Sequence, residues 1–207
     1  MTSGEQIGSR GEHALQECYG TQTRAQAFYD HQVLDYLNPH MQIFIAHQEM
    51  LFVATSDTNG ACDTSFRAGR PGFVQVLDQS TLAYPEYRGN GIMASLGNIT
   101  ENPHIGLLFL DFFQDKIGLH VNGRAQIVEN QALLQFPYPL DRVRADITGA
   151  GKTHAERWVV VTVEEAYIHC SKHIPKLQKP EQEIAWGTDN VHAKGGDYFK
   201  AKYSPRR

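Results

Sequence analysis

Residues 64–98 read TSFRAGRPGFVQVLDQSTLAYPEYRGNGIMASLGN, and this stretch decides the fold that the sequence predicts. It contains two short strand patterns, GFVQVLD and TLAYP, joined by a tight Asp-Gln-Ser connection, and the second strand is expected to end at Pro85. Two similar patterns come before these two strands, MLFVATSD at 50–57 and CDTSF at 62–66, separated by an Asp-Thr-Asn-Gly turn. Four short strands in about 35 residues, with no helix between them, indicate an antiparallel meander.

The same stretch carries a candidate anion site. Arg67 and Arg88 flank the strand pair, and Gly89, Asn90 and Gly91 then lead into a predicted helix. The first turn of a helix exposes unpaired backbone N–H groups at the positive end of the helix dipole. Glycine lets the backbone approach a ligand closely, and arginine binds phosphate with a planar set of donors. Either arginine alone would be interpreted as a surface residue, but together with the helix start they predict a phosphate-bearing cofactor.

The predicted helix covers residues 90–102. Its apolar side consists of Ile92, Leu96 and Ile99, and its polar side consists of Gly91, Ser95, Asn98 and Asn102. We therefore add Ser95 and Asn98 to the candidate site, although such side chains can also face water or bond to nearby backbone groups.

Two further strands are expected after the helix, at 104–113 and 116–128, and they form a predicted hairpin. In the second strand apolar and polar residues alternate, so one side belongs to the core and the other is wet or faces a ligand. Asn122 lies on the polar side, and because asparagine is depleted in strands it indicates either a ligand contact or a β-bulge. Residues 130–151 predict a short helix followed by a loop, and residues 157–170 predict a last, nearly continuous apolar strand.

The N-terminal residues, 1–40, predict a helical segment that precedes the strands. Ser9 and Glu12 form a possible capping box, and Asn38 followed by a proline is typical of the start of another helix. These helices are expected to cover one end of the sheet.

The fold class that follows is mainly β with flanking helices, in which residues 41–173 form a six- or seven-stranded antiparallel barrel, closed or partly open. Residues 174–207 are rich in Lys, Glu, Gln, Gly and Pro and predict a tail without a core of its own. Trp186 in this tail is expected to pack on the barrel, with a partner subunit or a cofactor edge as the alternatives.

The composition is that of a soluble globular protein. A length of 207 residues suits one sizeable domain, and the net charge is -4. The only basic cluster is Arg206 with Arg207, which argues against nucleic-acid binding. The three cysteines are far apart and predict no disulfide framework. The absence of an apolar stretch of signal or membrane-span length favours a cytoplasmic protein.

Two motif-like runs are interpreted as incidental. Residues 149–153 end like a phosphate-binding P-loop, but the first glycine of that motif would fall at Asp146. His169, Cys170 and His173 could ligate a metal, but three ligands at the end of one strand without a second cluster do not predict one.

Several motifs in one order then suggest a family. The runs FVATSDTNG, DTSFRAGRPGFVQVLD, TLAYPEYRGNG, SLGNITENPHIGLLFLDF and LHVNGRA resemble the FMN-binding split barrel of the pyridoxamine 5'-phosphate oxidase-like superfamily. The resemblance covers roughly residues 41–172 and is greatest to the FMN-dependent members outside the oxidase proper. Their shared elements are Arg-x-Gly, Pro-Gly-Phe, Gly-Asn, Asn-Pro and Val-Asn-Gly.

The resemblance implies a homodimer with two FMN molecules in clefts at the subunit interface. Ser65 and Arg67 match the first phosphate-side strand of the family, and Asn122 lies in the strand that passes the flavin ring. The residues in place of the phosphate loop are Arg88, Gly89, Asn90 and Gly91.

The oxidase proper has an Arg-x-Val-Leu-Leu-Lys strand and a C-terminal Arg-Leu-x-Pro, where this chain has SFRAG and YSPRR. The substrate site of that enzyme therefore cannot be transferred. The resemblance implies an FMN-dependent oxidoreductase acting on a small molecule, with no acid or base nominated. The alternatives are a flavin-binding storage or sensor module, or the same scaffold with a deazaflavin or haem.

Overall fold

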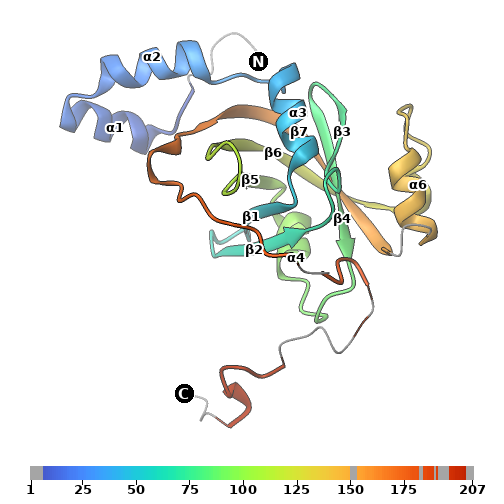
Figure 1. Cartoon of the computed structure of the whole chain (residues 1–207). Helices are drawn as coiled ribbons and strands as arrows, with labels where there is room; N and C mark the ends of the chain where they lie inside the picture. The colour runs from blue at the N-terminus through green and yellow to red at the C-terminus, as the bar shows by residue number, and fades with distance from the viewer. Residues whose placement is uncertain (1–6, 150–152, 182–183, 189, 191–195, 204–207) are drawn as a thin grey trace.

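The computed structural model describes residues 7–149, 153–181, 184–188, 190 and 196–203. Its body is one seven-stranded sheet in which every pairing is antiparallel (Figure 1). The strands are β1 Met50–Ser56, β2 Cys62–Ala68, β3 Gln75–Asp78, β4 Thr81–Tyr87, β5 His104–Leu110, β6 Gly118–Glu129 and β7 Ala155–His169. This confirms the mainly β, antiparallel class.

The helices are α1 Arg10–Tyr19, α2 Gln22–Gln32, α3 Pro39–His47, α4 Ala94–Glu101, α5 Asn130–Leu133 and α6 Asp141–Thr148, with single 3-10 turns at Ser171–His173 and Ala201–Tyr203. The predicted caps are present. Ser9 and Glu12 form the reciprocal capping box that begins α1, and the Asn38 side chain caps α3. In Figure 1, α1 and α2 form a hairpin beside the barrel, and α3 lies over one end of it.

The strand order differs from a simple meander. It runs β2-β1-β5-β6-β7-β4-β3, so the hairpins β1–β2 and β3–β4 lie at opposite ends of the sheet with three strands between them. The prediction of one continuous four-strand meander is therefore wrong. The chain places its long, apolar strands in the middle, because these can be buried on both sides, and leaves the half-exposed β2 and the four-residue β3 as edges.

The last strand, β7, is buried on both faces, as its apolar run predicted. Val159 and Val161 point into the main core, which also contains side chains from α3 and α4. Trp158 and Val160 point to the opposite side, into a second cluster that includes residues of α5 and α6. Each large apolar side chain that is fully buried contributes about 1.5–3 kcal/mol, so this doubly covered strand anchors the fold.

Helix α4 begins at Ala94, four residues later than the sequence predicted. The side chain of Asn90 accepts a hydrogen bond from the backbone N–H of Ile92, which forms a local turn instead of a helix. Gly91 and Met93 both adopt left-handed backbone conformations, which a right-handed helix cannot include. The predicted apolar side is therefore only partly correct: Leu96 and Ile99 are buried, but Ile92 is 75% exposed.

Two other boundaries also differ from the prediction. β4 continues past Pro85 to Tyr87, because β3 pairs with β4 only as far as Ala83 and the edge beyond pairs with no described strand. Proline is tolerated where a strand has a bare edge. The loop expected after the short helix α5 contains a second helix, α6.

Candidate functional site

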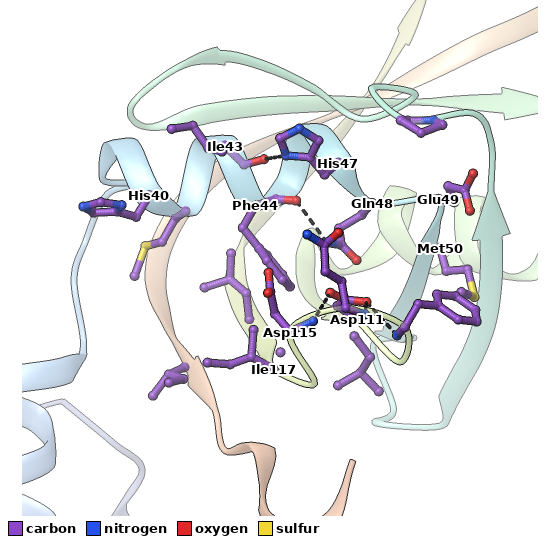
Figure 2. Close-up of a pocket in the computed structure, with 18 of the residues that line it drawn as sticks. His40, Ile43, Phe44, His47, Gln48, Glu49, Met50, Asp111, Asp115 and Ile117 are labelled. Carbon is purple, nitrogen blue, oxygen red and sulfur yellow. Dashed lines mark hydrogen bonds between the residues drawn. The ribbon is translucent and has the colours of Figure 1, made fainter. Parts of the chain in front are cut away.

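A pocket of about 790 Å³ lies beneath α3, between that helix and the loop that joins β5 to β6 (Figure 2). Its lining is mostly apolar and includes Phe44, Ile117 and Leu119. A space of this size suits a small molecule. None of the ten candidate residues from the sequence lines it, so the predicted anion site lies elsewhere.

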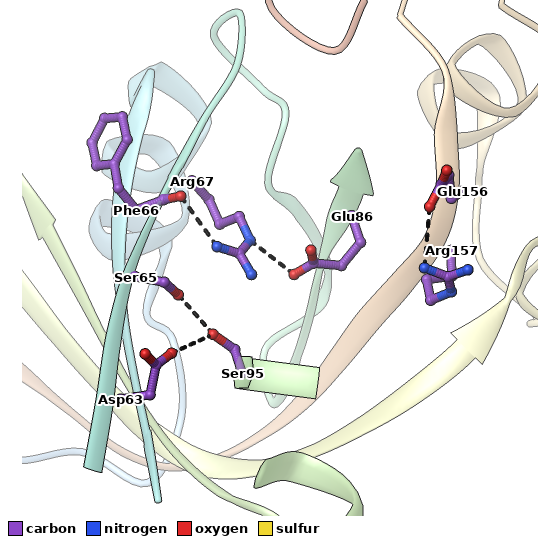
Figure 3. Close-up of polar contacts among 8 residues, drawn as sticks. All are labelled: Asp63, Ser65, Phe66, Arg67, Glu86, Ser95, Glu156 and Arg157. Carbon is purple, nitrogen blue, oxygen red and sulfur yellow. Dashed lines mark hydrogen bonds and ion pairs between the residues drawn. The ribbon is translucent and has the colours of Figure 1, made fainter. Parts of the chain in front are cut away.

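Three of the candidate residues come together where β2 meets α4 (Figure 3). Ser65 and Arg67 of β2 lie on the same side of the strand as Asp63, since alternate residues share a face. Ser95 lies in the first turn of α4, and Glu86 lies near the end of β4. We call Asp63, Ser65, Arg67, Glu86 and Ser95 the β2–α4 cluster.

An ion pair joins Arg67 and Glu86 within this cluster. Nε of Arg67 donates to Oε1 of Glu86 at 2.8 Å, and Nη1 donates to the carbonyl oxygen of Phe66 at 3.2 Å. Glu86 is only 7% exposed, and this burial raises the pKa of its carboxyl, although the Arg67 guanidinium opposes the rise. The Nη2 group of Arg67 has no hydrogen-bond partner among the described residues, so its two N–H groups can bind an anion.

A chain of hydroxyl groups joins β2 to the start of α4. The buried Ser95 donates to a carboxylate oxygen of Asp63 at 2.9 Å, and its Oγ is 2.8 Å from Oγ of Ser65. Because the Ser95 proton is directed at Asp63, Ser65 must be the donor to Ser95. Both hydroxyl protons are therefore used within the chain, and a phosphate could accept one of them only after Ser65 or Ser95 turns.

The loop Arg88–Met93 connects Glu86 on β4 to Ser95 on α4, and it therefore runs beside the β2–α4 cluster. Its candidate residues Arg88, Gly89, Asn90 and Gly91 are all exposed. At Gly89 and Gly91 the positions that a Cβ would occupy face open space, so a ligand can approach the backbone there. Since α4 begins only at Ala94, this loop and not a helix start carries the predicted phosphate-loop residues.

Asn98 was expected at the anion site, but its side chain bonds to strand β1 instead. Its side-chain amide donates to Oγ1 of Thr55 on β1 at 3.0 Å, and Asn102 donates to Oγ of Ser56 at 3.0 Å. The polar stripe of α4 thus faces the barrel strands and fastens the helix to them. Asn98 is half-buried against β1, outside the β2–α4 cluster.

Asn122 lies on the outer face of the sheet, away from the cluster. Its amide donates to Oε2 of Glu165 on β7 at 3.1 Å. The register between β6 and β7 shifts at this point: Asn122 pairs with Glu165 and Gly123 with Val163. A bulge is therefore present beside Asn122, but its extra residue, Glu164, lies on β7 and not on β6. The chain alone therefore does not bring Asn122 together with Arg67.

Trp186 lies in a tail segment that touches the end of β4. The next residue, Gly187, accepts a hydrogen bond from His154 N–H at 3.0 Å, and a Cβ there would lie 2.7 Å from the ring of Tyr87. Nζ of Lys179 is 6.0 Å from the centre of the Trp186 ring, and Lys179 also pairs with Glu49. The half-buried Trp186 thus packs on the chain's own elements, next to the loop that begins at Arg88.

Sequence reasoning missed a pair of histidines on the outer face. Nε2 of His120 and Nδ1 of His169 are 2.9 Å apart, and the Tyr167 ring stacks on His120 with centres 4.7 Å apart. The sequence already placed His120 on the polar face of β6, together with Asn122. Its contacts with Tyr167 and His169 could not be predicted, because they require knowing that β6 pairs with β7.

Within the described part of the chain, no group of three or more His, Cys, Asp or Glu residues could hold a metal ion. His169 and Cys170 therefore form no such group there with His173. The residues 150–152 of the P-loop-like run, like Arg206 and Arg207, lie outside the described residues. Among the described helices, none is long and apolar enough to cross a membrane.

A family model described as pyridoxamine 5'-phosphate oxidase matches residues 37–170, which is well over half of the chain. The chain belongs to the pyridoxamine 5'-phosphate oxidase family. The matched range contains the β2–α4 cluster, the loop Arg88–Met93 and Asn122, and it confirms the resemblance that the ordered motifs indicated. None of the curated proteins compared with the chain matches it.

Solved structures of low sequence identity are similar to the chain. HupZ of Group A Streptococcus is 20% identical, with a TM-score of 0.49, and the match covers 68% of this chain and 98% of that one. An FMN-binding protein of Syntrophomonas wolfei is 14% identical, with a TM-score of 0.46, and the match covers 78% and 98% of the two chains. An F420 reductase is 15% identical, with a TM-score of 0.39, and the match covers 62% and 94%.

Proposed function

We propose that the chain is an FMN-dependent oxidoreductase of this family, and that it binds the FMN phosphate between the β2–α4 cluster and the loop Arg88–Met93. The observation that carries the proposal is the side chain of Arg67. One edge of its guanidinium is held by Glu86, while Nη2 has no partner among the described residues. A held guanidinium with free terminal N–H groups is suited to a phosphate monoester.

The residues present fit such a group. Arg67 supplies a cation, and the open backbone at Gly89 and Gly91 leaves room for phosphate oxygens. The Tyr84 hydroxyl is a further polar group that is fully buried and has no hydrogen-bond partner in the described structure. Burial raises the pKa of this hydroxyl, and the charge of Glu86 adds to the rise. The negative charge of Asp63 disfavours an anion nearby, but one of its carboxylate oxygens already accepts a hydrogen bond from Ser95.

When bound, FMN would supply the redox chemistry through its flavin ring. The residues of this chain would bind and orient it: Arg67 and Arg88 at the phosphate, and Asn122 at the ring. Because Asn122 lies on the outer face of the sheet, we also propose that a second copy of the chain completes the site, which gives a homodimer with the cofactor at the subunit interface.

The test is whether the purified protein carries FMN. We expect a yellow protein that releases FMN on denaturation. The double variant R67A/R88A should bind FMN about a hundredfold more weakly, because two charge-assisted contacts are lost. The control R24A/R144A removes two exposed arginines from α2 and α6 and should retain FMN as the wild type does.

Other results separate the alternatives. A colourless protein that takes up no FMN when it is supplied would refute the proposal, and the absorption spectrum would then show whether a deazaflavin or haem is bound. If FMN is bound but reduced nicotinamides, amines, quinones and oxygen leave its redox state unchanged, the chain is a flavin-binding module without turnover.

A further inference from the structure

The barrel has an opening that backbone pairing does not close in the described structure. β2 is the last strand at one end of the sheet, and at the other end β3 covers β4 only as far as Ala83. The residues Tyr84–Tyr87 of β4 therefore pair with β7 on one side and with no described strand on the other. The ion pair of Arg67 and Glu86 joins β2 directly to this bare edge (Figure 3).

Glu86 is unusually placed for a carboxylate. It follows Leu82 and Tyr84 on the inward side of β4, and both of those side chains are fully buried. A carboxylate in such surroundings persists when a cation compensates its charge. Arg67 supplies that charge from β2, and Arg157, which is the cross-strand partner of Glu86 on β7, opposes the effect of burial from the other side.

We propose that Glu86 is a positioning residue of the anion site. By holding the Nε edge of Arg67, it fixes the long side chain in one orientation, with the Nη2 group left to bind the cofactor phosphate. The same bond closes the barrel between β2 and β4, so the shape of the barrel and the direction of the phosphate-binding cation are set together. This inference rests on the proposed function, because it concerns how Arg67 meets the FMN phosphate.

A positioning role makes a specific demand. FMN and riboflavin differ only in the phosphate. Replacing a residue that acts through Arg67 must therefore weaken the binding of FMN and leave the affinity for riboflavin almost unchanged. A residue that merely supports the fold would weaken both. A residue that competes with the phosphate for Arg67 would strengthen FMN binding when it is removed.

The experiment is a titration of the wild type, E86A and E86Q with FMN and with riboflavin, in which quenching of the flavin fluorescence measures binding. We expect E86A to bind FMN about tenfold more weakly. Without the charge-assisted bond from Glu86, the Arg67 side chain is no longer held in the orientation that directs Nη2 to the phosphate. Its riboflavin affinity should change less than about twofold, since no hydrogen bond to the ring is altered. E86Q should lie between wild type and E86A, because its amide oxygen can still accept from Nε of Arg67.

Two further variants serve as controls. E101Q alters an exposed carboxylate that accepts from Thr58, and it should bind both flavins as the wild type does. R67M/E86M removes both charges and keeps apolar contact across the opening, so its thermal unfolding should stay within a few degrees of wild type. It should nevertheless bind FMN about tenfold more weakly than the wild type while its riboflavin affinity is unchanged, because it keeps Arg88 but loses Arg67, and this separates closure of the barrel from recognition of phosphate.

The positioning role would be overturned if E86A and E86Q lost affinity for both flavins equally, or if they bound FMN as tightly as the wild type or more tightly. Either result would leave FMN binding by the wild type in place. A wild-type protein that binds neither flavin would overturn this inference together with the proposed function.

Discussion

His120 shows how a single residue acquires its properties from neighbours that are distant in the sequence. It is half-buried on β6, with His169 at hydrogen-bond distance and Tyr167 stacked on its ring, both from β7. Burial lowers the pKa of His120 below its ordinary value of 6.5, and the charge of His169 lowers it further. The folded protein therefore favours the neutral form of this imidazole more strongly than the unfolded chain does.

This shift predicts a pH dependence of stability. As pH falls through about 6.5, the unfolded chain takes up a proton at His120 before the folded protein does, so the free energy of unfolding decreases until the folded pKa is passed. The variant H120F keeps an aromatic ring against Tyr167 but cannot be protonated. We expect its melting temperature to fall less than that of the wild type between pH 7 and pH 5, as measured by circular dichroism. An identical fall in both proteins would contradict the assignment.

At the scale of elements, strand β6 and helix α4 each contain a glycine with a different role. A Cβ at Gly123 would lie 2.0 Å from the carbonyl oxygen of Thr162 on β7, so this glycine allows two strands to approach at the bulge. A Cβ at Gly97 would meet nothing within 4 Å, and that glycine lies exposed within α4.

The two glycines give a matched prediction. G123A should lower the free energy of unfolding by about 3 kcal/mol, because the backbone of β7 cannot yield as a flexible side chain could. G97A should raise it by about 0.5–1 kcal/mol, because alanine loses less conformational entropy in a helix. Urea unfolding of the two variants checks both signs, and a G123A variant as stable as the wild type would contradict the prediction.

At the scale of the whole molecule, the outer face of β1 and β2 has an aromatic pair without cover from the described helices. The rings of Phe52 and Phe66 are 5.4 Å apart, and Phe66 is 50% exposed. Asn122 lies on this outer face as well, two strands away from Phe52. A second copy seated here would bury apolar surface and bring its own residues toward Asn122.

This arrangement predicts how the proposed homodimer can be broken. F66E should yield a monomer in size-exclusion chromatography with light scattering at micromolar concentration, because a charge would be buried without a partner. L15E places the same charge on α1, at a leucine that is 58% exposed, and should leave a dimer. A wild-type protein that runs as a monomer would remove the basis for a shared site.

Much of the local structure could be predicted from neighbouring residues. Two helices begin where the sequence predicted, because a cap depends on residues within one turn. The capping box of Ser9 and Glu12 begins α1, and Asn38 before a proline begins α3. The alternation on β6 and the apolar run of β7 likewise predict burial, since side-chain direction follows from strand geometry. The start of α4 was missed because the side chain of Asn90 bonds to the backbone before the helix begins.

The sequence by itself determined the family and the strands, and it nominated Ser65, Arg67 and Ser95 among its candidate site residues. Only the tertiary structure decided the order of those strands, the partner of Arg67 and the location of Asn122 on the outer face. The physical reason is the sequence separation over which each interaction acts. Capping and alternation act between residues a few positions apart, whereas Glu86 reaches Arg67 only after β1, β5, β6, β7 and β4 have paired around a common core.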